Sequence, residues 1–470
     1  MIGTGVIGQA TALAVADRGV DVDLVGPRHA GESSATLAAG AMLGAFGEVT
    51  TAQDSVARQK ETTLRIDAQR RYAAWLETVE GRARRQVTAG CGTFVIANAA
   101  GQHDLVNLAE IEAAARAFGA PVERVSPEDV PWLRPTTKLP VLRALHLPEE
   151  GFVDAGELIA VLHQATDCHA SIQAHPRMAR SLDRDHGHTW KVTLENAEQL
   201  RANWVVVCAG HGVSRLLQPM RLPRLPKLIA GKGASVTMKG ESAPRHVIRT
   251  PNREFACGAH VVPRAEGQWY LGATNRLSRT PGLGAGVTGG ELHSLLHTGI
   301  HEINTSMRTA VVTGMRHGWR PLAVDRYPVV GKLDEGLAVA TATYRNGVLM
   351  APVLADWVAE TVVTDRDAKD NPFAPLARHV LLPHGPPTPE DVLAEGTKEL
   401  LAFLVAPHGE LPYDRQRELS AFLEGIVQIA LGDSDETTRE RQRLREALAD
   451  LPIAEVVADL FYQLADVDRF

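Results

Sequence analysis

The spacing of hydrophobic and polar positions at the start of the chain predicts a helix followed by a strand. Apolar residues recur with helical spacing from about Val6 to Arg18, and Gly19 ends the helix. A strand follows at Val20–Val25, and residues 54–80 again show the spacing of a long helix. This succession of elements is typical of an α/β protein.

Short apolar runs and helical stretches continue to alternate up to about residue 365. The pattern predicts strands at 92–96, 190–194, 204–208 and 337–341, and helices at 105–118, 154–165 and 348–363. The run at 204–208 has no polar alternation, which is typical of a strand buried on both faces. The short runs between 90 and 147 indicate a mixed rather than a purely parallel sheet.

The last eighty or so residues have a different character. A mostly polar stretch, 365–375, predicts a linker. Further on, Thr388 and Pro389 are typical of a helix start, and an apolar stripe includes Leu419 and Phe422. We therefore expect a C-terminal helical extension over 385–470, which offers a surface for a homo-oligomer or a partner protein.

Composition narrows the class of protein. The 470 residues are 44% hydrophobic and 22% charged, which predicts a globular enzyme of two domains or one enlarged domain. A formal net charge of −7 argues against nucleic acid as a partner. The four cysteines are far apart and form no CxxC pair, so we expect no metal site, no disulfide framework and a reducing cytoplasm. Neither a signal segment nor an apolar run of membrane-spanning length is evident.

The segment Gly3-Thr-Gly5-Val-Ile-Gly8 fits the pattern G-x-G-x-x-G, which places a pyrophosphate against bare backbone at a helix start. The alternative is an ordinary glycine-containing turn. Two departures from the dinucleotide-binding pattern are visible. Only two residues precede Gly3, so the strand expected before it is missing or clipped, and Gly26-Pro27 stand where an acidic residue would hold the adenosine ribose.

Several segments, taken in order, are more specific than this motif. They are Ser33-Ser-Ala-Thr-Leu-Ala-Ala-Gly-Ala-Met-Leu43, Gly151-Phe-Val-Asp154, Val205-Val-Val-Cys-Ala-Gly-His-Gly-Val-Ser214, Val262-Pro-Arg264 with Tyr270-Leu-Gly-Ala-Thr274, and Gly318-Trp-Arg-Pro321 with Pro328-Val-Val-Gly331 and Tyr344-Arg-Asn-Gly-Val-Leu349. Together they resemble the glycine oxidase and D-amino-acid oxidase family over roughly residues 1 to 365. The resemblance implies a Rossmann-like FAD-binding domain (1–85, 148–218 and 311–366) interleaved with a mixed-sheet substrate-binding domain (86–147 and 219–310).

The resemblance also implies non-covalent FAD, bound by small residues and by helix starts. The implied contacts are Gly3, Gly5, Val6, Ile7, Gly8, Ser33, Ser34, Ala39, Gly40, Met42, Ala209, Gly210, Arg320, Asn346, Gly347, Val348 and Leu349. Gly347 begins a helix whose positive end would stabilise anionic charge on the flavin. His211 has two interpretations, a place near the adenine half of the cofactor or a structural role.

Three residues are candidates for the chemistry. By resemblance, Arg320 anchors the substrate carboxylate, which a planar guanidinium binds through both oxygens; the alternative is a surface ion pair. Arg345 is a second candidate near the flavin, or a brace for its loop. His260 stands where glycine oxidases place a tyrosine, so it either binds a second carboxylate, accepts a proton from the substrate ammonium, or is a buried histidine with a backbone partner.

The implied reaction is FAD-dependent oxidation of the C–N bond of a small amino acid, with glycine, an N-substituted glycine or a D-amino acid as substrate. Hydride passes to flavin N5, the imine hydrolyses, and oxygen reoxidises the flavin with release of hydrogen peroxide. Two alternatives stay open. One is an amino-acid dehydrogenase that passes electrons to a quinone or protein acceptor, and the other is a non-catalytic flavin-fold protein that acts through its helical tail.

Overall fold

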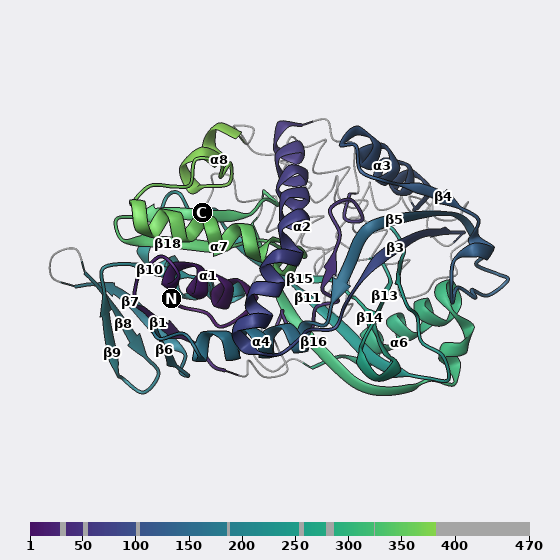
Figure 1. Cartoon of the computed structure of the whole chain (residues 1–470), viewed down its shortest axis with the longest axis horizontal. Coiled ribbons are helices and arrows are strands. Elements are labelled where there is room, and N and C mark those ends of the chain that lie inside the picture. The colour runs from purple at the N-terminus through teal and green to yellow at the C-terminus, as the bar shows by residue number, and fades with distance from the viewer. Residues whose placement is uncertain are drawn as a thin grey trace, which may run out of the picture.

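A computed structural model describes residues 1–28, 34–49, 55–99, 104–185, 189–252, 258–278, 286–323 and 325–381 of the chain. The C-terminal helical extension predicted at 385–470 lies outside the described residues. The described part contains a parallel sheet covered by helices and a second, larger sheet beside it (Figure 1).

The smaller of these two sheets consists of two groups of paired strands that a single residue joins at its centre. Its strands are β6 (Ile172–His175), β1 (Val22–Val25), β10 (Val205–Val207), β18 (Leu337–Thr341) and β17 (Val329–Asp334), all parallel except β17. Ile2 forms parallel bridges to both β1 and β10, and its N–H donates to the Val206 carbonyl at 2.8 Å. The clipped first strand expected from the sequence is therefore one bridging residue that joins these two groups of strands.

Helices cover one face of this sheet, and a small antiparallel sheet covers the other. The helices are α1 (Val6–Ala16), α2 (Val56–Ala83), α4 (Ala155–Asp167) and α7 (Gly347–Thr364), and the small sheet is β7 (Ala179–Arg184), β8 (Trp190–Leu194) and β9 (Gln199–Ala202). α1, α4 and α7 pack on the apolar strands in one core cluster, and Trp190 belongs to the cluster on the opposite face. Asp154 caps α4 by accepting hydrogen bonds from the N–H groups of Gly156 and Glu157.

The larger sheet has ten strands in a mixed arrangement. They are β15 (Arg276–Ser278), β11 (Leu228–Lys239), β14 (Gln268–Gly272), β13 (His260–Pro263), β12 (Val247–Arg249), β3 (Ala89–Asn98), β5 (Val141–Val153) and β2 (Met42–Leu43), with β16 (Val311–Ala323) beside β11 and β4 (Glu123–Val125) beside β5. Because β16 pairs along nearly all of β11, it belongs to this sheet although its end reaches the parallel sheet. The predicted domain boundaries stay a prediction, since strand pairing alone does not delimit domains.

Shorter helices complete the described fold: α3 (Asp104–Ala117), α5 (Val213–Leu217), α6 (Gly289–Thr298) with a π-helical turn at Gly299–Ile303, α8 (Pro375–Leu381), and 3-10 turns at Pro127–Asp129, Gly210–Gly212, Gln218–Met220, Ala265–Gly267 and Thr305–Arg308. α3 and α6 lie beside the larger sheet (Figure 1). The predicted α/β class, with a helix-covered parallel sheet and a separate mixed sheet, is confirmed.

The linker predicted at 365–375 is wrong. Phe373 is fully buried, and the Asn371 side chain donates a hydrogen bond to the Val330 carbonyl at 2.7 Å. Beyond it, the Arg378 guanidinium donates to the Pro328 carbonyl at 2.6 Å, which fastens α8 to the start of β17. The polar side chains that suggested a linker are used to satisfy backbone groups of the parallel sheet.

α7 is the described helix that comes nearest to a membrane-spanning segment. By length and composition its 18 residues would suffice, but 67% of that segment is buried inside the protein. Among the described helices it is the only one to meet the length and composition test. Its packing against α1 and α2 is that of a core helix.

Candidate functional site

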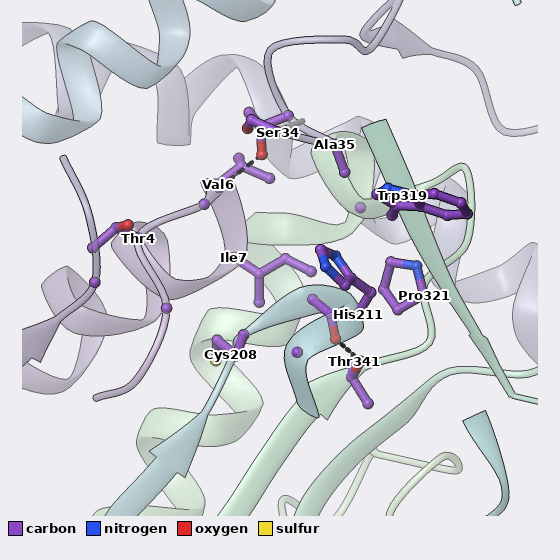
Figure 2. A pocket seen from close by; sticks show the side chains of 18 of the residues that line it. Thr4, Val6, Ile7, Ser34, Ala35, Cys208, His211, Trp319, Pro321 and Thr341 are labelled. Atoms are coloured by element: carbon purple, nitrogen blue, oxygen red, sulfur yellow. Dashed lines mark hydrogen bonds between the residues drawn. The ribbon is translucent and has the colours of Figure 1, made fainter. Parts of the chain in front are cut away.

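A cavity of about 780 Å³ opens at the carboxyl ends of β1, β10 and β18. The start of α1 lines one side of it, and the start of α7 and the end of β16 line another. Figure 2 shows residues from these segments around the space, with Ile7, His211 and Trp319 facing one another. Ligands of open α/β sheets bind at this edge, where helix starts and strand ends converge.

The glycine motif gives the cavity a close-packed backbone wall. A Cβ on Gly3 would lie 2.2 Å from the Cys208 carbonyl oxygen, and a Cβ on Gly8 would lie 2.0 Å from the Gly3 carbonyl oxygen. Gly5 is the N-cap of α1 with no side-chain cap, and the first turn carries no acidic residue. The Val6 N–H donates to the Thr36 hydroxyl at 3.2 Å, and the remaining positive helix end fits the diphosphate of the predicted FAD.

The missing ribose acid has a steric reason. Gly26 has a positive φ of 154°, and a Cβ there would lie 2.8 Å from the Thr4 side chain. The Thr4 hydroxyl in turn donates to the Pro27 carbonyl at 2.7 Å. An acidic side chain would therefore displace the turn that lines this end of the cavity.

Most of the predicted cofactor contacts meet at this cavity. The lining includes Gly3, Gly5, Val6, Ile7, Ser34, Ala39, Ala209, Gly210, Arg320, Gly347 and Val348, together with Arg345. The lining does not include Gly8, Gly40, Met42, Asn346 and Leu349, nor His260. Ser33 lies outside the described residues. The roles of all these residues stay a prediction.

The predicted cofactor contacts that are outside the cavity lining pack against other parts of the protein. Gly8 faces Gly3, Met42 pairs with Phe152 in the larger sheet, and Leu349 is buried in the helical core. The lining also includes residues that the sequence did not single out as contacts: Ala35, Thr36, Trp319, Thr341, Thr343 and Tyr344. Ala35, Thr36, Trp319 and Tyr344 lie inside the quoted motifs and Thr343 adjoins one, and these positions were the only available signal.

Arg320 reaches the cavity through a gap left by a glycine. Its strand β16 runs beside β11, and a Cβ on Gly233 would lie 2.1 Å from the guanidinium. Nη1 donates to the Thr274 carbonyl and to the Asn275 side-chain oxygen, both at 3.0 Å. Among the described residues no carboxylate forms an ion pair with Arg320. The guanidinium therefore retains its positive charge and its capacity to bind an anion.

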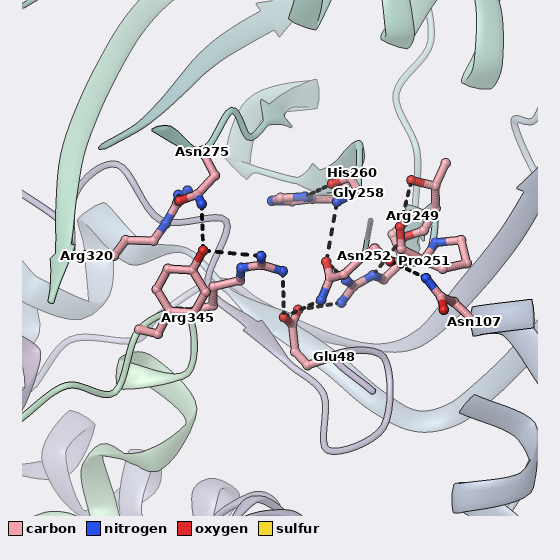
Figure 3. A network of polar contacts seen from close by, with 12 residues as sticks. Glu48, Asn107, Arg249, Pro251, Asn252, Gly258, His260, Asn275, Arg320 and Arg345 are labelled. Atoms are coloured by element: carbon pink, nitrogen blue, oxygen red, sulfur yellow. Dashed lines mark hydrogen bonds and ion pairs between the residues drawn. The ribbon is translucent and has the colours of Figure 1, made fainter. Parts of the chain in front are cut away.

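A second guanidinium, Arg345, also lines the cavity and belongs to a polar network (Figure 3). Its Nη1 is 3.6 Å from a Glu48 carboxylate oxygen, and its Nη2 donates to the Tyr344 hydroxyl at 3.4 Å. The Asn275 side chain donates to the same hydroxyl at 2.6 Å, which connects this group to Arg320. Arg345 is therefore ion-paired, whereas Arg320 has no carboxylate partner within the described part of the chain.

His260 is buried and held by its own strand end. Its Nδ1 lies 2.9 Å from the Gly258 carbonyl oxygen, which makes Nδ1 the protonated nitrogen of the neutral ring. The ring stacks on Tyr270, and a Cβ on Gly40 would lie 3.0 Å from Nε2. Burial and the nearby Arg249 lower the pKa of His260 to about 3. The imidazole is therefore neutral at physiological pH and supplies no charge for a second carboxylate.

Replacing His260 with Asn is expected to make the protein less sensitive to mild acid. The native pKa lies below the ordinary value of a histidine, so the unfolded chain binds the extra proton and stability falls as pH drops from about 6.5 toward 3. Between pH 6.5 and pH 5, the wild type should lose about 1.5 kcal/mol more unfolding free energy than the variant. Urea unfolding at the two pH values measures this, with His293→Asn, at an exposed position on α6, as control. Equal losses in wild type and His260→Asn would contradict the neutral buried ring.

Two side chains fix the small-residue segment that follows Ser34. The Arg264 guanidinium donates to the carbonyls of Ala39 and Gly40 at 3.2 and 3.1 Å, and the Tyr270 hydroxyl donates to the Ala38 carbonyl at 3.1 Å. Arg264 is also paired with Asp154 at 3.3 Å. The two motifs that supply Arg264 and Tyr270 thus support the wall of the cavity rather than line it.

His211 lies on the turn after β10 and lines the cavity, with its ring centroid 6.5 Å from that of Trp319. Burial and the neighbouring Arg215 lower its pKa. Its place in the lining favours contact with a ligand over a purely structural role.

Comparison with known proteins gives one family and close agreement in fold. The family described as DAO, FAD dependent oxidoreductase, matches residues 1–361. Glycine oxidase of Geobacillus kaustophilus (strain HTA426) is 28% identical over 397 residues, which are 81% of this chain and 96% of that protein. The crystal structure of glycine oxidase from Geobacillus kaustophilus has a TM-score of 0.69 at 23% identity and covers 82% of this chain and 98% of its own. The structure of iminodiacetate oxidase from Chelativorans sp. BNC1 has a TM-score of 0.66 at 21% identity and covers 80% and 98%.

Proposed function

The chain belongs to the DAO family of FAD-dependent oxidoreductases, and on that premise we propose that it oxidises the C–N bond of a small amino acid. The glycine oxidase relative, which matches along 96% of its length, supports an amino-acid substrate. Glycine, an N-substituted glycine and a D-amino acid are the substrates to compare. Bound FAD would accept the hydride that leaves the substrate α-carbon.

The observation that carries this proposal is the unneutralised guanidinium of Arg320. It lines the cavity, it has only neutral oxygen acceptors among the described residues, and the Gly233 backbone leaves room for it. A substrate carboxylate would complete its charge pairing and would fix the α-carbon relative to the cofactor. Arg345 and Tyr344 then line the neighbouring part of the cavity, where the rest of the substrate would lie.

The charges around the cavity also favour the reactive form of the substrate. An amino acid binds as a zwitterion, but its ammonium must lose a proton before oxidation. The cavity lining contains no carboxylate among the described residues, so no negative side chain there raises the pKa of a bound ammonium, while Arg320 and the partly paired Arg345 lower it. Deprotonation therefore requires no dedicated base, and His260, which lies outside the cavity lining, has no assigned part in it. After oxidation the imine hydrolyses, and oxygen is the proposed acceptor, with hydrogen peroxide as its product.

The purified protein is expected to be yellow, with flavin absorbance near about 450 nm. Glycine, sarcosine, D-alanine and L-proline should be tested for bleaching of this band without air and for hydrogen peroxide with air. Bleaching together with peroxide supports an oxidase. Bleaching without peroxide would show a dehydrogenase that uses another acceptor, and colourless protein that FAD does not stabilise would show a non-catalytic protein.

A further inference from the structure

Glu48 lies on the short segment after β2, whose backbone is held by the buried Glu150. The N–H groups of Phe46 and Gly47 donate to one carboxylate oxygen of Glu150, at 2.6 and 3.0 Å. Glu150 is itself buried at the end of β5. The segment therefore holds Glu48 in one position beside the cavity.

The Glu48 carboxylate joins a guanidinium of the larger sheet to one that lines the cavity. One oxygen is 2.7 Å from Nη1 of Arg249, and the other accepts from the Asn252 side chain at 2.7 Å and lies 3.6 Å from Arg345 (Figure 3). The Arg249 side chain is 2% exposed, and those of Glu48 and Arg345 are 11% exposed. Burial alone would raise the pKa of Glu48, but Arg249 and Arg345 outweigh it and hold that pKa well below its usual range.

We propose that Glu48 is a specificity-determining residue whose carboxylate takes, on Arg345, the place of a second substrate carboxylate and so restricts the enzyme to amines with one carboxylate. Arg345 lines the same cavity as Arg320, and the Tyr344 hydroxyl and the Asn275 amide connect the two. A dicarboxylate anchored on Arg320 would bring its second charge toward Arg345. There it would meet the fixed negative charge of Glu48 at close range in a buried site, where charges interact strongly.

This inference rests on the proposed function, because it concerns the substrate that Arg320 anchors. Sarcosine and iminodiacetate are the matched pair of substrates, since iminodiacetate has one more carboxylate on the same secondary amine. The wild-type holoenzyme is expected to prefer sarcosine. Glu48→Gln, which removes the charge and keeps the shape, should raise the iminodiacetate-to-sarcosine ratio of kcat/KM by about tenfold or more.

Two further variants separate charge from structure. Glu48→Asp keeps the carboxylate, so its ratio should stay near that of the wild type. Arg249→Gln also breaks the buried ion pair between Arg249 and Glu48, but it removes the positive partner. The negative charge of Glu48 is then less compensated, so the iminodiacetate-to-sarcosine ratio should fall. If Glu48 had only a structural role, Glu48→Gln and Arg249→Gln would change the iminodiacetate-to-sarcosine ratio in the same direction. Both variants lose the same Glu48–Arg249 ion pair.

A binding measurement makes the test independent of turnover. Methoxyacetate and diglycolate are the ether counterparts of the two substrates and offer no amine to oxidise. Their dissociation constants, obtained from perturbation of the flavin spectrum, should show the same change in preference. If Glu48→Gln does not retain FAD, Arg249→Gln serves as the test. Its iminodiacetate-to-sarcosine ratio must then be lower than that of the wild type.

The possible outcomes distinguish failure of the role of Glu48 from failure of the proposed function. An unchanged ratio in Glu48→Gln, or parallel shifts in Glu48→Gln and Arg249→Gln, would overturn the role of Glu48 while the oxidation of sarcosine stands. If no amino acid bleaches the wild-type flavin, the proposed function itself fails. In that case the two ether ligands still report whether removal of the Glu48 charge favours a second carboxylate.

Discussion

Replacing Arg320 with Ala is expected to raise KM for the amino-acid substrate by about 100-fold, because loss of one partner from a buried charge-assisted contact costs several kcal/mol. FAD should remain bound, since the glycine loop and the starts of α1 and α7 are untouched. Steady-state kinetics give KM and kcat, and flavin absorbance gives the FAD content. We expect the affinity for methoxyacetate to fall by a similar factor.

Two controls make this result specific to the position of the guanidinium. Arg316→Ala removes an exposed arginine from the same strand and should leave KM unchanged. Gly233→Ala keeps Arg320 but places a methyl group 2.1 Å from where its guanidinium lies, so KM should rise although the charge is retained. An unchanged KM in Arg320→Ala would remove Arg320 from the proposed anchor and leave Arg345 as the remaining candidate.

Local sequence patterns pointed to much of the cavity lining, because its walls are made of short, contiguous motifs. The glycine turn at Gly3, the segment around Ala39, the strand end at Gly210 and the helix start at Gly347 each contribute backbone from one motif. Such motifs have recognisable compositions because close approach of backbone to a ligand requires small residues. Their meeting in one cavity follows from the parallel sheet, whose strand ends lie at one edge.

The charged network behind the cavity could not be predicted in this way. Glu48 and Arg249 are 201 positions apart, and neither lies in a motif that suggested a role. Their contact depends on how β12 and the segment after β2 approach each other in the folded chain. The buried stretch around Phe373 shows the same limit, since its polar composition indicated exposure while its side chains satisfy a sheet edge.

The state of His260 also depended on tertiary structure. Its sequence position indicated a residue near the substrate, but its burial and the field of Arg249 decide its charge. No sequence pattern gives the pKa of a side chain, because that value depends on groups distant in the chain. The choice between a charged and a neutral histidine therefore became available only with the folded structure.

Replacing Gly8 with Ala is expected to weaken FAD binding by about 100-fold, because an added methyl group in a close-packed backbone contact forces the chain to move. The new Cβ would lie 2.0 Å from the Gly3 carbonyl oxygen, and that oxygen belongs to the loop that lines the cavity. Backbone cannot rotate away as a flexible side chain does, so α1 must shift from the diphosphate site. FAD content after purification and titration of the apoprotein with FAD measure the loss.

Gly81→Ala is the matched control, because Gly81 lies in α2 with no atom near its missing side chain and should tolerate the methyl group. Circular dichroism of both variants separates loss of FAD from loss of fold. Retention of full FAD by a folded Gly8→Ala variant would mean that the contact between α1 and the glycine loop does not set the diphosphate site. Cofactor binding would then have to depend on the start of α7 and on the residues that line the opposite side of the cavity.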